Sequence, residues 1–324
     1  MPPAPLGQHI VMRLREDRVL APTVEARRAF ARAVLRVAEP FALLATRASD
    51  THVHLLVACP EPEARELGRR LGVSLRRVLA LPTPFERARL RPVHDQWHLA
   101  SAFRYVLGQH AHHGIGGDEL FEASNLPDLL GMRLLGAHAT AHVRGLLPRV
   151  GRTELLALLG VPDLDEPRAI HPDDLPDAAA GAVGLPDLAG LSAPVVAARR
   201  AALAVAAALS VRPAPRASAP QTTLASALGV HPRTLRQLAR SSPDRRLVHA
   251  VLLQLRARAA VRARGGWPPD SEAARAAADR GSRLATAEVA SGRWLPRARH
   301  RSSPSSRPGC PPRSSSRGAQ GPLV

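Results

Sequence analysis

The feature that most constrains the fold is a pair of short apolar segments separated by three residues. Residues 41–47 (FALLATR) and 51–59 (THVHLLVAC) flank the turn Ala48-Ser49-Asp50. Apolar runs of this length joined by so tight a turn predict a β-hairpin. Any fold for this part of the chain must therefore contain the hairpin.

Segments of alternating strand and helix character surround the hairpin. Residues 8–15 (QHIVMRLR) alternate apolar and polar side chains, which predicts a first strand. Residues 24–39 carry apolar side chains at helical spacing after Thr23, a candidate N-cap. Residues 60–81 predict a second helix, acidic at its start and basic later, as the helix dipole favours. The pattern then predicts a strand within 85–95 and a helix over 96–113.

This order predicts an α+β protein whose residues 1–116 adopt the ferredoxin-like split β-α-β arrangement. Residues 117–160 are rich in leucine and predict a helical extension, and residues 161–192 predict an acidic linker of Pro, Asp and Ala. Residues 193–264 predict a helical module. The Arg, Ser and Pro-rich residues 265–324 cannot bury a core and predict a disordered tail.

The charge of the 324-residue chain is distributed unevenly. The net charge is +18, and all 45 basic residues are arginine. Residues 1–116 hold 17 arginines against 10 acidic residues, residues 117–190 hold 5 against 12, and residues 191–324 hold 23 against 5. Two basic regions that flank an acidic one suit a chain that binds a polyanion such as DNA at two places.

Several classes of protein are disfavoured. The two cysteines, Cys59 and Cys310, argue against a disulfide scaffold or a cysteine-rich zinc module. No apolar run approaches the ~20 residues that span a bilayer, and residues 1–16 lack the order of a signal peptide. We therefore expect a cytoplasmic protein of bacterial type, associated with the nucleoid.

The strongest local motif is His52-Val53-His54 within the second strand of the hairpin. Residues two apart on a strand point to the same face, so both imidazoles project together. Such a pair can bind a divalent metal. The alternative interpretation is two ordinary histidines on the exposed face of the hairpin.

A second motif joins Tyr105, the only tyrosine, to Gln109 four residues later. On a helix these residues share a face. A phenol can act as a nucleophile, and an amide oxygen can complete a metal shell. In the alternative interpretation Tyr105 is a boundary aromatic with a buried ring and a solvated hydroxyl. The nearby His110, His112 and His113 offer a competing metal site, although residues so spaced on a helix converge only in part.

Together, the two motifs supply the metal site and the nucleophile that a single-stranded-DNA nuclease needs. The sequence here resembles the HUH single-tyrosine transposases, which comprise insertion-sequence transposases and their REP-associated relatives. The resemblance covers roughly residues 8–116. It is carried by the segments QHIVMRL, SDTHVHLLV and WHLASAFRYVLGQ.

The resemblance implies an enzyme that nicks and rejoins single-stranded or hairpin DNA during transposition. It implies that His52, His54 and Gln109 bind Mg²⁺ or Mn²⁺. It also implies that Tyr105 attacks DNA to form a 5′-phosphotyrosine intermediate. Some relatives are homodimers in which the tyrosine of one subunit serves the other, whereas REP-associated relatives can act alone.

Two departures leave the subfamily open. REP-associated members usually follow the tyrosine with Asn-Pro, where this chain has Gln109-His110. The residue before the first histidine is usually Asn, and here it is Thr51.

A helix-turn-helix pattern lies in the C-terminal basic region, over residues 224–238. Gly229 permits the turn, and Pro232 suits the first position of the second helix. That helix would present side chains that reach phosphates and base edges, namely Arg233, Thr234, Arg236 and Gln237. The alternative is an ordinary helical hairpin.

Three other functions compete with a transposase. One is a non-enzymatic DNA-binding regulator on a degenerate HUH scaffold, and another is an HUH nuclease of replication or plasmid mobilisation. Many of the latter carry paired tyrosines, whereas this chain has one tyrosine. A zinc hydrolase would need a third ligand that the motifs do not supply.

Overall fold

The computed structural model describes residues 4–109, 118–161, 163–164, 170–209 and 220–263. The alternative metal site at His110, His112 and His113 therefore lies outside the described residues, as does the tail predicted over 265–324.

The N-terminal elements follow the predicted order. They are β1 (Gly7–Arg13), α1 (Val24–Val37), β2 (Leu43–Ala48), β3 (His52–Val57), α2 (Glu61–Val78), β4 (Arg89–Val93) and α3 (Gln96–Leu107). The strands form one antiparallel sheet in the order β2-β3-β1-β4. Because β3 lies between β1 and β2, which α1 connects, this is the split β-α-β topology. The predicted α+β class is confirmed.

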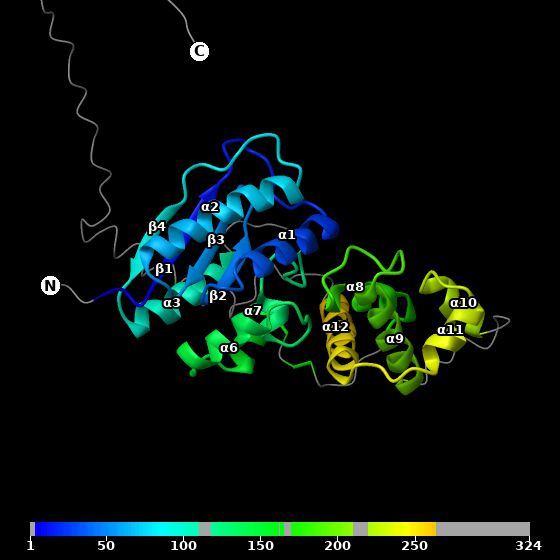
Figure 1. Ribbon diagram of the computed structural model, residues 1–324. Helices are drawn as coiled ribbons and strands as arrows, with labels where there is room; N and C mark the ends of the chain where they lie inside the picture. Colours follow the sequence, from blue (N-terminus) through cyan, green and yellow to red (C-terminus); the bar gives the residue numbers. More distant parts are fainter. Residues whose placement is uncertain (1–3, 110–117, 162, 165–169, 210–219, 264–324) are drawn as a thin grey trace, which may run out of the picture. The chain divides into compact units, whose positions relative to one another are not determined.

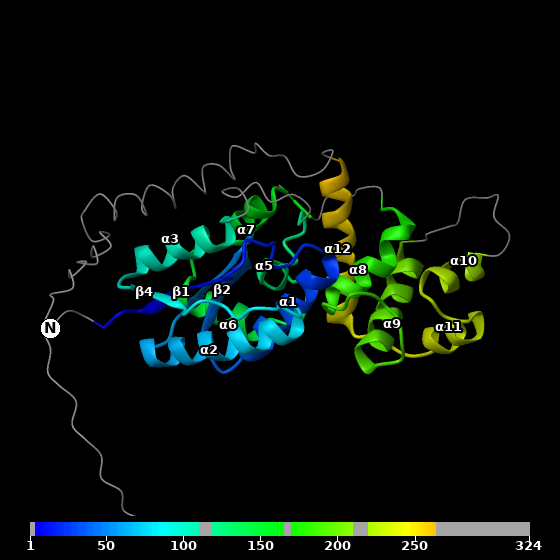
Figure 2. The same ribbon diagram turned by 90° about the horizontal axis from the view of Figure 1, so that it is seen from above.

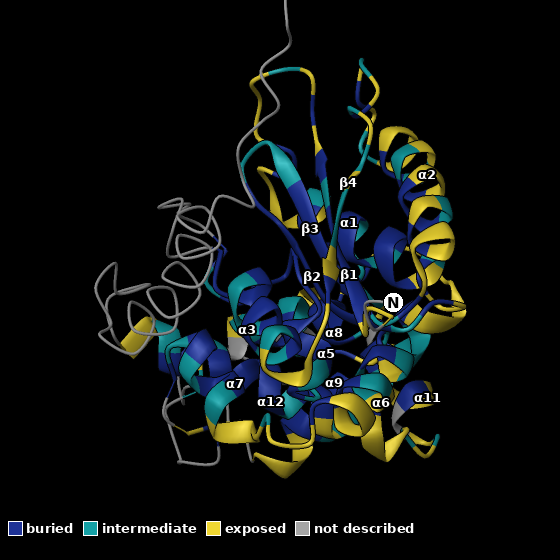
Figure 3. Ribbon diagram, turned by 90° about the vertical axis from the view of Figure 1, so that its left-hand side faces the viewer, coloured by how far each residue is buried: buried dark blue, intermediate teal, exposed yellow. Residues whose placement is uncertain are grey.

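Helices cover both faces of the sheet, with α1 and α2 on one side and α3 on the other (Figures 1 and 2). Strand side chains alternate between the faces. Ile10 and Met12 of β1 pack in the core beneath α1 and α2, while Leu56 of β3 packs with Phe103 and Val106 of α3. Figure 3 shows that the outward side of α2 is exposed and its inward side buried.

Local sequence signals explain where the helices begin. The Thr23 hydroxyl accepts a hydrogen bond from the backbone N–H of Ala26 at 3.2 Å, as expected of an N-cap for α1. The Asp95 carboxylate caps α3 by accepting from the N–H of His98 at 2.8 Å. These caps fix the first turn of each helix.

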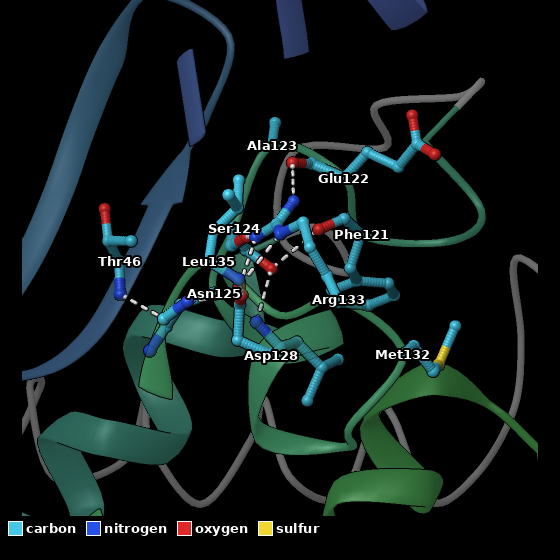
Figure 4. A network of polar contacts seen from close by, with 12 residues as sticks. Thr46, Phe121, Glu122, Ala123, Ser124, Asn125, Asp128, Met132, Arg133 and Leu135 are labelled. Carbon is cyan, nitrogen blue, oxygen red and sulfur yellow. Dashed lines mark hydrogen bonds and ion pairs between the residues drawn. The ribbon is translucent and has the colours of Figure 1, made fainter. Parts of the chain in front are cut away.

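The edge of β2 is covered by the segment that follows residue 117. The amide of Asn125 accepts from the N–H of Thr46 at 2.9 Å and donates to the carbonyl of Leu44 at 3.0 Å (Figure 4). The N–H of Ala48 donates to the carbonyl of Ala123 at 2.9 Å. These contacts satisfy an edge that would otherwise expose unpaired backbone groups.

A buried ion pair shapes the same segment. Arg133 donates to Asp128 at 2.9 Å, and the other Asp128 oxygen accepts from the N–H groups of Leu135 at 3.0 Å and Gly136 at 2.7 Å (Figure 4). In the helical extension predicted over 117–160, the described residues 118–125 are not helical. Its helices are α5 (Leu126–Leu129), α6 (Ala137–Leu146) and α7 (Arg152–Leu159).

The linker predicted over 161–192 is corrected in part, because a buried helix lies within it. The turn η1 (Pro172–Asp174) leads into α8 (Leu175–Ala182), whose alanines pack in a core with α9 and α12. An alanine-rich segment resembles a linker in composition, but its small side chains allow close helix packing. The other helices lie where predicted: α9 (Ala193–Ala208), α10 (Pro220–Ala227), α11 (Pro232–Ala239) and α12 (Arg245–Ala263). None of the described helices is both long enough and apolar enough to cross a membrane.

Candidate active site

The sheet register brings histidines of two strands onto one face. His54 of β3 pairs with Val11 of β1, and His9 of β1 pairs with Leu56 of β3. Directly opposite residues share a face, so His9 lies on the same side as His54 and His52. This is the face that α3 covers.

The two predicted metal ligands of β3 lie together. The ring centroids of His52 and His54 are 4.6 Å apart, with 68° between the ring planes. His54 is only 4% exposed. It is therefore not the solvent-exposed histidine of the alternative interpretation, whereas His52 is half-buried.

Tyr105 reaches the histidines from α3 of the same chain. Its ring centroid lies 5.8 Å from that of His54 and 5.8 Å from that of His9. Both contacts are nearly perpendicular, at 87° and 80°. Because Phe103 and Val106 anchor α3 in the core, the position of the phenol is set by the packing of the helix.

Gln109 lies just beyond Gly108, the C-cap of α3, and is 1% exposed. Its side-chain amide points back toward the carbonyl of Tyr105, with 3.5 Å between nitrogen and oxygen. Gln109 is thus buried beside Tyr105, one helical turn away, as its spacing predicted.

The predicted ligand set consists of two imidazoles and one amide. Among the described residues, no group of three or more His, Cys, Asp or Glu side chains is placed to hold a metal. The third ligand implied by the resemblance is the amide oxygen of Gln109, which lies outside that set of residue types. Imidazole nitrogen with amide oxygen is a donor set that fits Mn²⁺ and, with added waters, Mg²⁺.

His9 is a site residue that the sequence analysis missed. Its Nε2 atom lies 3.0 Å from Nδ1 of His54, and its side chain is buried. Burial, followed by the charges of Arg91 and His98, lowers the pKa of His9 from 6.5 to about 3. His9 is therefore neutral at physiological pH. In the sequence, His9 is only a polar residue in an alternating strand. Its contact with His54 depends on the pairing of β1 with β3, which the local sequence does not indicate.

A positive side chain borders the histidines on the other side. Arg47 of β2 pairs with His54 in the sheet, and its guanidinium lies 4.1 Å above the ring of Phe121. Burial lowers the pKa of Arg47 to about 10, opposed by Asp118 at 3.5 Å, so Arg47 stays charged.

A groove of about 380 Å³ opens beside His52. Its lining includes four arginines from β1, β4 and the loop before β4, which we call the arginine groove: Arg13, Arg87, Arg89 and Arg91. Asp17, Asp50 and Glu86 also line it, and Glu86 lies 3.7 Å from Arg89. The groove is thus mixed in charge, with arginine in excess.

The predicted helix-turn-helix segment consists of α10, a turn and α11. Gly229 in the turn has φ +62°, a conformation that favours glycine. Leu235 and Leu238 of α11 are buried. Of the predicted DNA-binding residues, Thr234 is half-buried and three are exposed: Arg233, Arg236 and Gln237.

Comparison with protein-family models, with curated proteins and with solved structures finds no match to this chain.

Proposed function

We propose that the protein is a transposase-like endonuclease and strand transferase, which acts on single-stranded hairpin DNA through Tyr105. The observation that carries this proposal is the packing of Tyr105 against His54, at 5.8 Å between ring centroids. Tyr105 on α3 and the histidine pair on β3 come from separate elements, and their proximity supports a site at which a nucleophile and a bound metal would meet, as phosphodiester cleavage requires.

The proposed reaction is a transesterification, which needs no external oxidant or energy source. The Tyr105 oxygen attacks the phosphorus and the P–O3′ bond breaks. The phenolic proton passes to solvent, and the departing 3′ oxygen takes up a proton from solvent. The products are a 5′-phosphotyrosine and a free 3′-hydroxyl. In the reverse step a 3′-hydroxyl attacks the phosphotyrosine and releases the phenol, which joins DNA ends and completes strand transfer.

Each site residue has a proposed role. His52, His54 and Gln109 would hold Mg²⁺ or Mn²⁺, which supplies Lewis-acid polarisation of the scissile phosphate when bound. Arg47 is the β2 residue paired with His54 in the sheet, and its positive charge is proposed to offset part of the extra negative charge of the pentavalent phosphorus. Anchoring of α3 in the core holds the Tyr105 oxygen in place.

Incubation of the wild-type chain with single-stranded hairpin DNA and Mn²⁺ tests this function. We expect a covalent protein–DNA product on a denaturing gel, absent when EDTA replaces Mn²⁺. A hairpin library is the suitable substrate, because the recognised sequence is undefined. Sequence-specific binding without any covalent product would instead favour the DNA-binding regulator.

The arginine groove is the proposed path of the single strand beside His52. We expect the double substitution R13A/R89A to weaken single-strand binding and to reduce the slope of log affinity against log salt by about 0.7 for each lost phosphate contact. Fluorescence anisotropy at several salt concentrations measures both. The double substitution R69A/R77A is the matched control, because Arg69 and Arg77 are exposed arginines of α2, on the opposite side of the sheet. An equal effect of that control would assign the loss to net charge alone.

The helix α11 is the proposed second DNA contact. We expect Arg233→Ala and Arg236→Ala each to weaken binding to a double-stranded hairpin stem and to reduce its salt slope by about 0.9 per phosphate contact. Arg36→Ala, an exposed arginine of α1, is the control. Unchanged affinity and slope in both α11 variants would mean that this segment is an ordinary helical hairpin.

A further inference from the structure

Each predicted metal-binding histidine has a neighbour at its Nδ1 atom. Nε2 of His9 lies 3.0 Å from Nδ1 of His54 in a buried contact between β1 and β3. The hydroxyl of Thr51 lies 3.4 Å from Nδ1 of His52. A neutral imidazole carries one N–H and one lone pair, so a partner at one nitrogen decides the role of the other.

We propose that His9 is a positioning residue that holds His54 in the tautomer protonated at Nδ1. The His54 Nδ1–H then donates to the lone pair of His9 Nε2, and the lone pair of His54 Nε2 is directed to the divalent metal. The opposite tautomer would place a proton on His54 Nε2 and prevent coordination there. This inference rests on the proposed function, because it concerns the same site.

The surroundings of His9 suit this role. The His9 and His54 rings are 5.3 Å apart and nearly parallel, at 20°, while Tyr105 packs edge-on against His9. The register of β1 against β3 fixes the backbone positions of His9 and His54 relative to each other. With its ring enclosed by the sheet and α3, His9 can orient His54 before any metal binds. Such outer partners of metal ligands fix both the tautomer and the ring orientation.

The first test needs no substitution. Nitrogen-15 NMR of the metal-free wild-type chain, with labelled histidine, reports which ring nitrogen of each residue carries the proton. We expect the His54 signal, assigned by its loss in His54→Gln, to show protonated Nδ1 and unprotonated Nε2. A His54 signal with the proton on Nε2 would overturn the proposal.

The second test is Mn²⁺ binding, measured by the electron paramagnetic resonance signal of free Mn²⁺. His9→Phe keeps a ring of similar size but removes the acceptor, and we expect Mn²⁺ affinity to fall about 10–100-fold. His9→Gln returns an acceptor near the lost Nε2 and should recover much of that affinity. His94→Phe is the matched control, since His94 is exposed just after β4.

Mn²⁺ binding tests the role of His9, and formation of the covalent product tests the nuclease separately. If wild type binds Mn²⁺ and His9→Phe, folded by circular dichroism, binds it equally well, His9 has no positioning role. If His9→Phe does not fold, the wild-type tautomer and the His9→Gln affinity decide. A wild-type chain that binds no Mn²⁺ overturns the inference, whereas Mn²⁺ binding with the expected tautomer but no covalent product overturns the nuclease alone.

Discussion

Tyr105→Phe should abolish the covalent protein–DNA product while leaving the fold and DNA binding intact. The substitution removes one oxygen, and the remaining ring can keep its contacts with His9 and His54. Removal of the nucleophile removes the group that forms the covalent bond, so we expect the rate of product formation to fall on the order of a thousandfold or more. The change in the free energy of unfolding should stay within about 1 kcal/mol.

The composition of the chain makes this prediction unusually specific. Because Tyr105 is the only tyrosine, phosphotyrosine found in a digest of the wild-type product must derive from it. The link should survive mild alkali, which eliminates phosphoserine. Anisotropy with the same hairpin DNA gives the binding control. A covalent product of Tyr105→Phe at the wild-type rate would exclude the tyrosine mechanism and return the proposal to the DNA-binding regulator.

The sequence predicts the sheet domain well because its signals are local. The tight turn at residues 48–50 specifies the hairpin, and the N-cap Thr23 fixes the first turn of α1. The shared face of His52 and His54 follows from strand periodicity alone. Their proximity to Tyr105 was predicted only through a family resemblance.

The features that escaped prediction depend on pairing between distant segments. His9 and His54 are 45 positions apart, and only the register of β1 against β3 makes them neighbours. Asn125 covers the β2 edge through two hydrogen bonds that no periodicity indicates. The alanines of α8 are buried without an amphipathic pattern, so their composition by itself indicates a linker. Polar pairing and close helix packing are both decided by tertiary contacts.

We expect Tyr105 to act in the active site of its own chain. Mixing His54→Ala chains with Tyr105→Phe chains should give no more covalent product than either variant alone. The contact of Tyr105 with His54 lies within one chain, so the proposed site needs no residue from a second subunit. If the tyrosine instead acted across a dimer, a mixed dimer would hold one intact site, in which the His54→Ala chain supplies Tyr105.

The packing of α3 gives the physical reason to expect an intramolecular nucleophile. Phe103, Val106 and Leu99 are at most 1% exposed, and burial of such side chains is worth about 1.5–3 kcal/mol each. Arg104 of α3 also pairs with Glu154 of α7 at 2.6 Å. Delivery of Tyr105 to another subunit by detachment of α3 would have to sacrifice these contacts.

The mixing experiment separates the two arrangements by the mass of the product. A size tag on the His54→Ala chain marks it, because only that chain keeps the tyrosine in the mixture. Tagged covalent product that appears on mixing would contradict the intramolecular arrangement and require a homodimer. Wild-type product formation per chain should also stay constant on dilution at saturating DNA, since a site assembled within one chain has no subunit equilibrium to lose.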